Sequence, residues 1–171
     1  IGYGALTSNT TANFNVAVGM KSIHSATTGD SNTASGGYTM VYTTTGSGNT
    51  ASGYKALYYN TTGGQNTASG RYALRQNTTA SYNTGFGACT LTSTVTGAKN
   101  TAVGYRAGAA NTCGDYNVAM GYEAFRCNTT GCWNTAIGTI SLYNNTTGND
   151  NVAIGKHALR QNTTAGKNTA V

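Results

Sequence analysis

"NTASGRYALRQNTTA", residues 66–80, recurs with a few changes as "NVAIGKHALRQNTTA", residues 151–165. The two stretches start 85 residues apart, which is five periods of 17, and the same 17-residue unit runs through the whole chain without insertion or deletion. Its consensus is N-T-A-x-G-x-x-A-L-x-x-N-T-T-G-x-x, and its first asparagine, position 1 of the unit, stands at Asn15, Asn32, Asn49, Asn66, Asn83, Asn100, Asn117, Asn134, Asn151 and Asn168. Strict periodicity is typical of a repeat protein whose units bury their apolar faces by stacking on one another.

The repeats form a single array over residues 1–171, with a partial unit at 1–14, nine full units at 15–167 and a partial unit at 168–171. Only 8% of the residues are charged and 38% are hydrophobic, which argues against a solvated disordered tract. Both ends fall inside a unit, and the capping repeats that a solenoid normally carries are missing. We therefore expect a segment of a longer fibre.

One unit has room for a strand, a corner and a tight turn. The stretch N-[TV]-A-[VIS]-G has strand character, and N-T-T-G is typical of a turn. We predict an all-β fold, a β-solenoid or β-roll of about ten 17-residue coils with Asn and Thr ladders along its axis. The segment G-x-x-A-L-x-x-N could form a second strand or corner, or a short helical turn. The roughly 4.8 Å spacing of strands disfavours stacked helices, which need about 8–10 Å.

Large polar and aromatic residues keep to a few unit positions. All Lys and Arg lie at positions 6, 7, 10 or 17, and all twelve tyrosines lie at positions 6, 7, 10, 11 or 17. These positions are predicted to face outward, and alanine with the apolar residue of position 9 is predicted to form the core. Position 9 is apolar from Leu6 to Leu159, with Gly108 the only gap.

Position 4 suggests an oligomer. It is Val, Ile or Met in several units but serine in three consecutive ones, Ser35, Ser52 and Ser69. One leucine-sized residue and two alanines bury little apolar area per coil, so a partner chain that covers position 4 would add stability. We expect a homo-oligomer, with a trimer favoured.

A family resemblance agrees with this expectation. The motifs "NVAVG", "NTAVG", "NVAMG", "NTAIG" and "NVAIG" resemble the repeated S-V-A-I-G motif of the left-handed β-roll heads of trimeric autotransporter adhesins. The whole unit, as in "GYKALYYNTTGGQNTASG", is similar to repeats of phage tail fibres and large bacterial surface proteins. The resemblance implies a homotrimeric shaft or head of an attachment fibre, located outside the cell, on a cell surface or on a virion.

Other classes of function find little support. His24 and His157 are about eight coils apart, the four acids form no close pair, and the glycines belong to the repeat, so we expect no enzyme, cofactor or metal. The net charge of +6 is spread along the chain without a basic run, which disfavours nucleic acid as a partner. No run is long and apolar enough for membrane insertion.

Cys127 and Cys132 flank one turn in "CNTTGC" and are candidates for a disulfide. Free thiols or another pairing are the alternative, and a metal site is disfavoured because Cys89 and Cys113 occupy different unit positions. N-x-T sequons recur in the turns, and glycosylation is conceivable at Asn60, Asn77, Asn128, Asn145 and Asn162. Their simpler interpretation is that Asn and Thr are there to make the turn.

The predicted function is a structural and adhesive fibre segment for surface attachment. Cell-surface glycans are candidate partners, and the aromatic side chains predicted to contact them are Tyr54, Tyr58, Tyr59, Tyr105, Tyr122 and Trp133. The alternatives are a single-chain solenoid subunit of an extracellular filament, and an ice-binding solenoid with threonine columns at positions 13 and 14.

Overall fold

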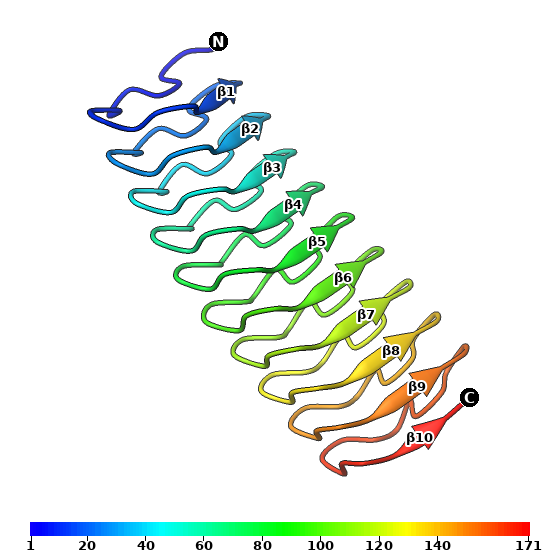
Figure 1. Ribbon diagram of the computed structural model, residues 1–171. Helices are drawn as coiled ribbons and strands as arrows, with labels where there is room; N and C mark the ends of the chain where they lie inside the picture. The colour runs from blue at the N-terminus through cyan, green and yellow to red at the C-terminus, as the bar shows by residue number, and fades with distance from the viewer.

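The computed structural model describes all 171 residues as a parallel β-solenoid of about nine turns (Figure 1). Ten short strands form one parallel sheet in chain order: β1 (Val16–Val18), β2 (Thr33–Ser35), β3 (Thr50–Ser52), β4 (Thr67–Ser69), β5 (Thr84–Phe86), β6 (Thr101–Val103), β7 (Val118–Met120), β8 (Thr135–Ile137), β9 (Val152–Ile154) and β10 (Thr169–Ala170). Each strand pairs with the strand one unit away, so that Ala17 lies opposite Ala34 and Ala34 opposite Ala51. The predicted all-β solenoid and its 17-residue coil are confirmed.

Hydrogen bonds between coils continue far beyond the strands. Of 112 backbone hydrogen bonds, only 18 lie within the strands. In the corner segment, for example, the amides of Leu57 and Tyr59 donate to Ala73 and Arg75 of the next coil, each at 3.0 Å. Most of the chain in each coil is therefore held at the spacing of paired strands.

The segment from position 6 to position 11 is a corner made of consecutive turns, and the chain contains no helix. Positions 7 and 9 adopt left-handed backbone conformations even where they carry large side chains, as in Lys55 (φ 56°) and Leu57 (φ 50°). These conformations let the peptide groups face neighbouring coils, because the amide of Lys55 donates to Gly37 of the preceding coil and that of Leu57 to the following one. The predicted corner is confirmed, and its alternative, a helical turn, is wrong because helical hydrogen bonds would have kept these groups inside the coil.

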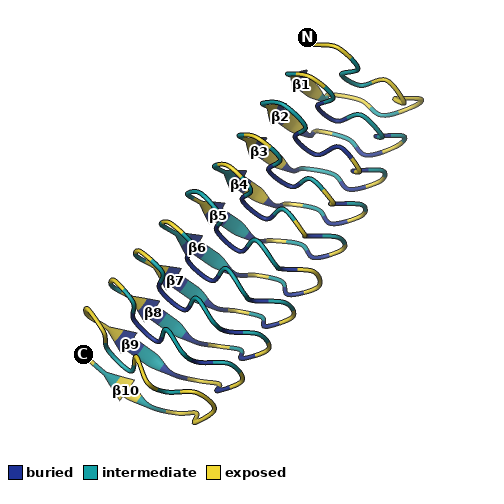
Figure 2. Cartoon of the chain, turned by 180° about the vertical axis from the view of Figure 1, so that it is seen from behind, coloured by how far each residue is buried: buried dark blue, intermediate teal, exposed yellow.

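The apolar core lies inside the coil. Figure 2 colours the buried residues, apolar and polar, dark blue along the chain. The strands contribute position 3, usually alanine, to the core. The middle residue of each strand from β1 to β9 is buried, while its two neighbours are exposed or half-buried. Position 9 is the other contribution, with fully or almost fully buried Ile23, Met40, Leu57, Leu74, Leu91, Phe125 and Leu142. The predicted core positions are confirmed.

Two ladders of buried asparagine run beside this core. At position 1, Nδ2 of Asn66 donates to Oδ1 of Asn49 at 3.1 Å. The same oxygen accepts the backbone N–H of Asn66 at 3.0 Å. At position 12, Nδ2 of Asn77 donates to Oδ1 of Asn60 at 2.8 Å. In one coil the two asparagines meet, because Asn49 and Asn60 both donate to the carbonyl of Gly63 at 2.9 Å. The expected asparagine ladders are thus present and internal. The ladder of position 1 is continuous, whereas that of position 12 is interrupted at Ala26, Thr43 and Thr94.

The threonines of position 13 also form a ladder, although hydroxyls do not bond to hydroxyls. Thr61 Oγ1 donates to the backbone carbonyl of Thr78 at 3.0 Å, and most other coils repeat this bond.

Glycine at position 5 is a steric requirement of the stacking. A Cβ on Gly104, where φ is +122°, would lie 2.6 Å from the carbonyl oxygen of Gly121 in the next coil. The chain contains no helix long and apolar enough to cross a membrane.

Candidate functional site

The first candidate surface is a tyrosine–cation cluster on the corner of the coils that begin with β2, β3 and β4. It comprises Tyr38, Tyr42, Tyr54, Lys55, Tyr58, Tyr59, Arg71, Tyr72 and Arg75. Tyr42 and Tyr59 are stacked, with ring centroids 5.6 Å apart and planes 7° from parallel. Burial, with a smaller effect of Tyr42, raises the pKa of the Tyr58 hydroxyl. These contacts exist because side chains at equal or neighbouring positions of adjacent coils lie about one strand spacing apart.

A shallow recess of about 490 Å³ adjoins this cluster. Its lining combines the rings of Tyr42 and Tyr59 with the side chains of Gln76, Thr78 and Val95 and with Thr61. Stacked rings beside an amide are chemically suited to the apolar face of a sugar ring, while the hydroxyls of Thr61 and Thr78 already donate to backbone carbonyls of the next coil. Of the six aromatic residues predicted to contact glycans, Tyr59 lines this recess, and Tyr54 and Tyr58 belong to the cluster.

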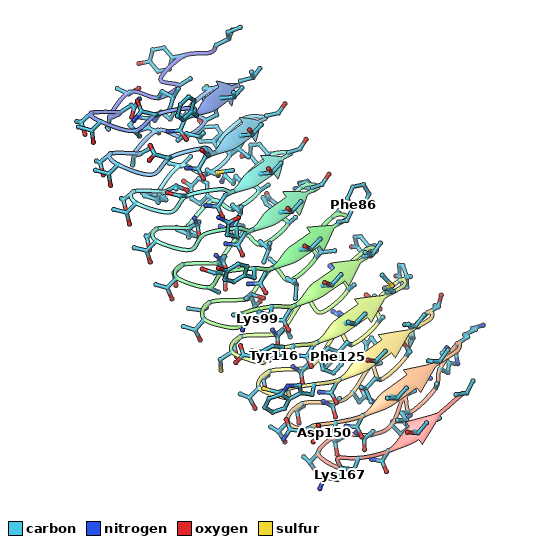
Figure 3. All side chains as sticks on the ribbon, viewed as in Figure 1. Phe86, Lys99, Tyr116, Phe125, Asp150 and Lys167 are labelled. Carbon is cyan, nitrogen blue, oxygen red and sulfur yellow. The ribbon has the colours of Figure 1, made fainter.

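The remaining predicted aromatic residues lie elsewhere. Tyr105 and Tyr122 form a stacked pair at position 6, with centroids 5.5 Å apart. Trp133 stacks on Tyr116 at position 17, at 5.8 Å, and Lys99 donates to the hydroxyl of Tyr116 at 2.6 Å. That hydrogen bond raises the pKa of Lys99. Figure 3 shows Lys99, Tyr116, Asp150 and Lys167 along one edge of the stack, the column of position 17.

All four cysteines are free thiols, and the predicted disulfide between Cys127 and Cys132 is not formed. Cys132 belongs instead to a ladder at position 16, in which a side chain accepts the backbone amide of the preceding coil. Its Sγ accepts the amide of Asp115 at 3.2 Å, just as Oδ1 of Asp115 accepts that of Ala98 at 2.7 Å. Burial raises the pKa of the Cys127 thiol. The flanks of the turn are thus engaged with neighbouring coils rather than with each other.

The sequon asparagines have a structural role. Asn60, Asn77, Asn128 and Asn145 are fully buried, and Nδ2 of each donates to the position 15 carbonyl of its own coil. Asn162 is half-buried and makes the same bond, to Ala165 at 2.9 Å. A glycan on one of the four fully buried nitrogens would disrupt the ladder, whereas Asn162, the last asparagine of the ladder, is only half-buried.

Titratable groups are dispersed over the solenoid. His24 lies in the coil of β1 and His157 in that of β9, and no group of three or more His, Cys, Asp or Glu could hold a metal ion. Glu123 is the only acid in a salt bridge, with Arg106 and Arg126, each at 3.6 Å. Asp30 and Asp115 accept backbone amides of the preceding coil. The side chains that the structure groups together on the surface therefore lie in columns, at the same or neighbouring unit positions of adjacent coils.

Sequence reasoning did not find Tyr42, Tyr72, Lys55 and Arg75 as parts of one cluster. The signal was available, because they occupy positions 7, 10 and 11 of consecutive units. The chain matches no protein-family model, no curated protein and no solved structure. Its fold places it among repeat proteins of the parallel β-solenoid class.

Proposed function

We propose that this chain is a segment of a surface-displayed structural and adhesive fibre, without catalytic activity, that acts outside the cell or on a virion. Its copies associate as a homo-oligomer, with a trimer favoured. A stack of nearly identical coils, hydrogen-bonded along most of their length, is suited to a stiff shaft that keeps its cross-section over its length.

The observation that carries the proposal is the outer face of the sheet. Positions 2 and 4 flank the buried alanine and point away from the core, so the chain's own core closes without them. The face carries no charged residue, and toward the C-terminal end most of its side chains are apolar, with Val103, Val118, Met120, Ile137, Val152 and Ile154 beside the threonines Thr101, Thr135 and Thr169. An extended apolar face of this kind is typical of an interaction surface. The three serines of position 4 lie at the other end of the face and remain compatible with a wetter contact.

Light scattering on the purified chain tests the oligomer. The double variant Ile137→Asp with Ile154→Asp places two charges on the sheet face, where both side chains are more than one third exposed (37% and 38%). We expect assembly to be lost while the circular dichroism spectrum stays that of the wild type. The control adds the same charges to the exposed position 14 column, as Thr147→Asp with Thr164→Asp, and should still assemble. A wild-type chain that is monomeric at all concentrations, or a sheet-face variant that still assembles, would refute the proposal.

The adhesive part of the proposal rests on the tyrosine–cation cluster and its recess. A tyrosine ring offers a rigid apolar face at low entropic cost, and Gln76 adds an amide that can hydrogen-bond beside it. The simpler interpretation is that these tyrosines stabilise the corner by stacking. A glycan array of neutral oligosaccharides separates the two interpretations. If the tyrosines only stabilise the corner, no oligosaccharide binds. If the recess is adhesive, the chain binds and Tyr59→Ala weakens the binding.

Ice binding is a second candidate, favoured by the threonines of position 14. Their side chains are exposed in every full coil that carries one, whereas the position 13 hydroxyls mostly bond to the backbone of the next coil. A column of hydroxyls at the strand spacing, interrupted only at Cys113, is thus presented to water. A thermal-hysteresis measurement decides, since a fibre without this activity shows none.

A further inference from the structure

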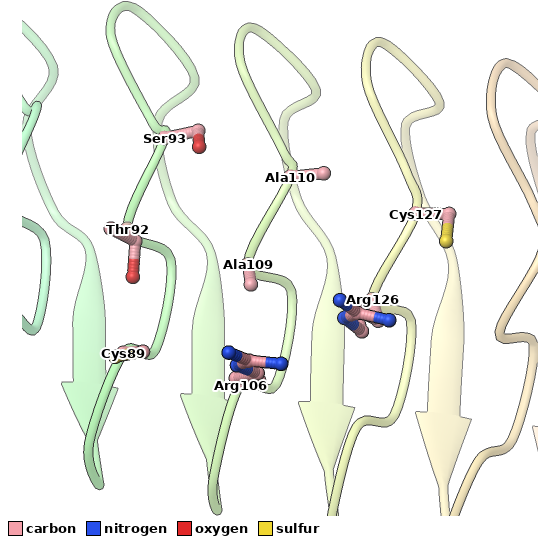
Figure 4. Close-up of a pocket in the computed structure, with 8 residues that line it drawn as sticks. All are labelled: Cys89, Thr92, Ser93, Arg106, Ala109, Ala110, Arg126 and Cys127. Carbon is pink, nitrogen blue, oxygen red and sulfur yellow. The ribbon is translucent and has the colours of Figure 1, made fainter.

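A second recess, of about 420 Å³, lies on the corner of three consecutive coils, those that begin with β5, β6 and β7 (Figure 4). It is lined by residues of positions 7, 10 and 11. Its volume is at the small end of the range of about 300–1,000 Å³ typical of ligand pockets. The recess is open to the surface and separate from the tyrosine–cation cluster.

The recess exists because the middle coil lacks large side chains. Ala109 and Ala110 occupy positions 10 and 11, where the coil of β3 carries Tyr58 and Tyr59. The preceding coil has only Thr92 at position 10 and Ser93 at position 11. Two methyl groups therefore form the floor, and two hydroxyl side chains form one wall.

Positive charge frames this recess. Arg106 and Arg126 line it, with side chains that are 41% and 35% exposed. Glu123, only 13% exposed, lies 3.6 Å from each guanidinium group, so it holds both in place and neutralises one of the two charges. One positive charge remains. Each guanidinium has five N–H donors. Arg126 donates to the hydroxyl of Tyr143, and both groups pair with Glu123, which leaves several donors free to bind an anion.

An aromatic platform adjoins the charged end. The guanidinium carbon of Arg106 lies 5.1 Å from the ring centroid of Tyr105, which in turn stacks on Tyr122. Both rings are well exposed, at 41% and 50%. The surface thus presents, side by side, cationic forks, hydroxyl groups, a small apolar floor and a pair of stacked rings.

We propose that this recess binds an acidic sugar, with the sugar's carboxylate on Arg106 and Arg126 and its ring over Ala109 and Ala110. Paired N–H donors of guanidinium groups match the two oxygens of a carboxylate. Thr92 and Ser93 supply hydroxyls for the sugar's own hydroxyl groups, and Tyr105 with Tyr122 provides a platform for the next sugar. The inference adds a second binding site, with its own ligand class, to the adhesive function proposed above, and rests on that function.

Titration calorimetry with three probes tests the site on the whole chain: 3′-sialyllactose, neutral lactose and a sulfated disaccharide. We expect 3′-sialyllactose to bind and lactose to bind at least about tenfold more weakly, as the loss of a charged hydrogen bond implies. Added salt should weaken the binding. Equal affinity for lactose, binding of the sulfated probe alone, or no binding of any probe would overturn the proposal.

Two variants localise the binding. Arg106→Gln removes one charge, and the double variant Ala109→Tyr with Ala110→Tyr fills the recess with side chains that another coil carries at the same positions. Each should weaken 3′-sialyllactose binding about tenfold or more. The control Arg160→Gln removes an exposed arginine from position 10 of the β9 coil, and should bind like the wild type. Unchanged binding in either site variant would refute this location.

Failure of the acidic-sugar proposal can be distinguished from failure of the fibre proposal. Assembly is measured by light scattering and depends on the residues of the sheet face, not on those of the recess. A chain that assembles but binds no acidic sugar refutes the recess alone.

Discussion

The asparagine ladder of position 1 is tested most directly at its centre, by Asn100→Ala. The side chain of Asn100 takes part in four hydrogen bonds. Its Nδ2 donates to Asn83 Oδ1 (3.2 Å) and to the carbonyl of Gly114 (2.8 Å), and its Oδ1 accepts the backbone amide (2.9 Å) and Nδ2 (3.1 Å) of Asn117. Alanine removes all four inside a region where Asn100 is only 1% exposed.

The magnitude depends on which partners remain satisfied. Asn83 Oδ1 keeps the backbone amide of Asn100, and the carbonyl of Gly114 keeps Nδ2 of Asn111. Nδ2 of Asn117 keeps the carbonyl of Gly131, but the backbone amide of Asn117 is left buried without a partner. The orphaned amide costs about 1–3 kcal/mol and each of the three other lost bonds contributes about 1 kcal/mol, so we expect a destabilisation of about 4–6 kcal/mol.

Urea unfolding followed by circular dichroism measures this loss, and hydrogen exchange at the Asn117 amide reports it locally. The control is Asn144→Ala at position 11, whose Nδ2 donates only to Gln161 at the surface and which should cost less than about 0.5 kcal/mol. If Asn100→Ala costs no more than the control, or if the Asn117 amide stays protected as in the wild type, the ladder does not stabilise the fold as argued.

Two further predictions concern backbone strain and thiol reactivity. Gln65 has φ +58° at an exposed position 17, so Gln65→Gly should stabilise the chain by about 0.5–1 kcal/mol in urea unfolding, whereas Gln76→Gly, at an exposed site without positive φ, should destabilise it. Burial raises the pKa of Cys127 and so lowers its thiolate fraction at pH 8. Iodoacetamide should therefore label exposed Cys113 faster than Cys127, as peptide mass spectrometry would show, and equal rates would contradict the burial.

The coil and its core follow from the period alone. A strictly conserved spacing of 17 residues places like positions one above another, so Ala17, Ala34 and Leu57 could be assigned to the interior without coordinates. The outward direction of the tyrosine positions followed in the same way. The register of the repeat decides which residues stack on one another, and this register can be read from the sequence.

The backbone conformation of the corner could not be predicted from the sequence. Leucine at φ 50° contradicts local preference, because a side chain at Cβ disfavours the left-handed region. Leu57 adopts this conformation since its amide must reach Ala73 in the next coil. The same limit explains the cysteines: Cys127 and Cys132 are near in sequence, but the stacking assigns Cys132 to an amide of the preceding coil. Local spacing cannot reveal a constraint that neighbouring coils impose.

The polar ladders also explain how one coil can lose its apolar anchor. At position 9 of the β6 coil stands Gly108, yet its amide still donates to Ala124 at 3.0 Å, and Asn100 and Asn111 both still bond to Gly114. Leu91 of the preceding coil leans into the vacated space, with Cδ2 only 2.9 Å from where a Cβ on Gly108 would lie. Because the ladders hold the register regardless of core volume, the outward positions of that coil are free to shrink to Ala109 and Ala110. A repeat held together by its constant polar positions can thus carry a local recess, the one proposed above to bind an acidic sugar, without interrupting the stack.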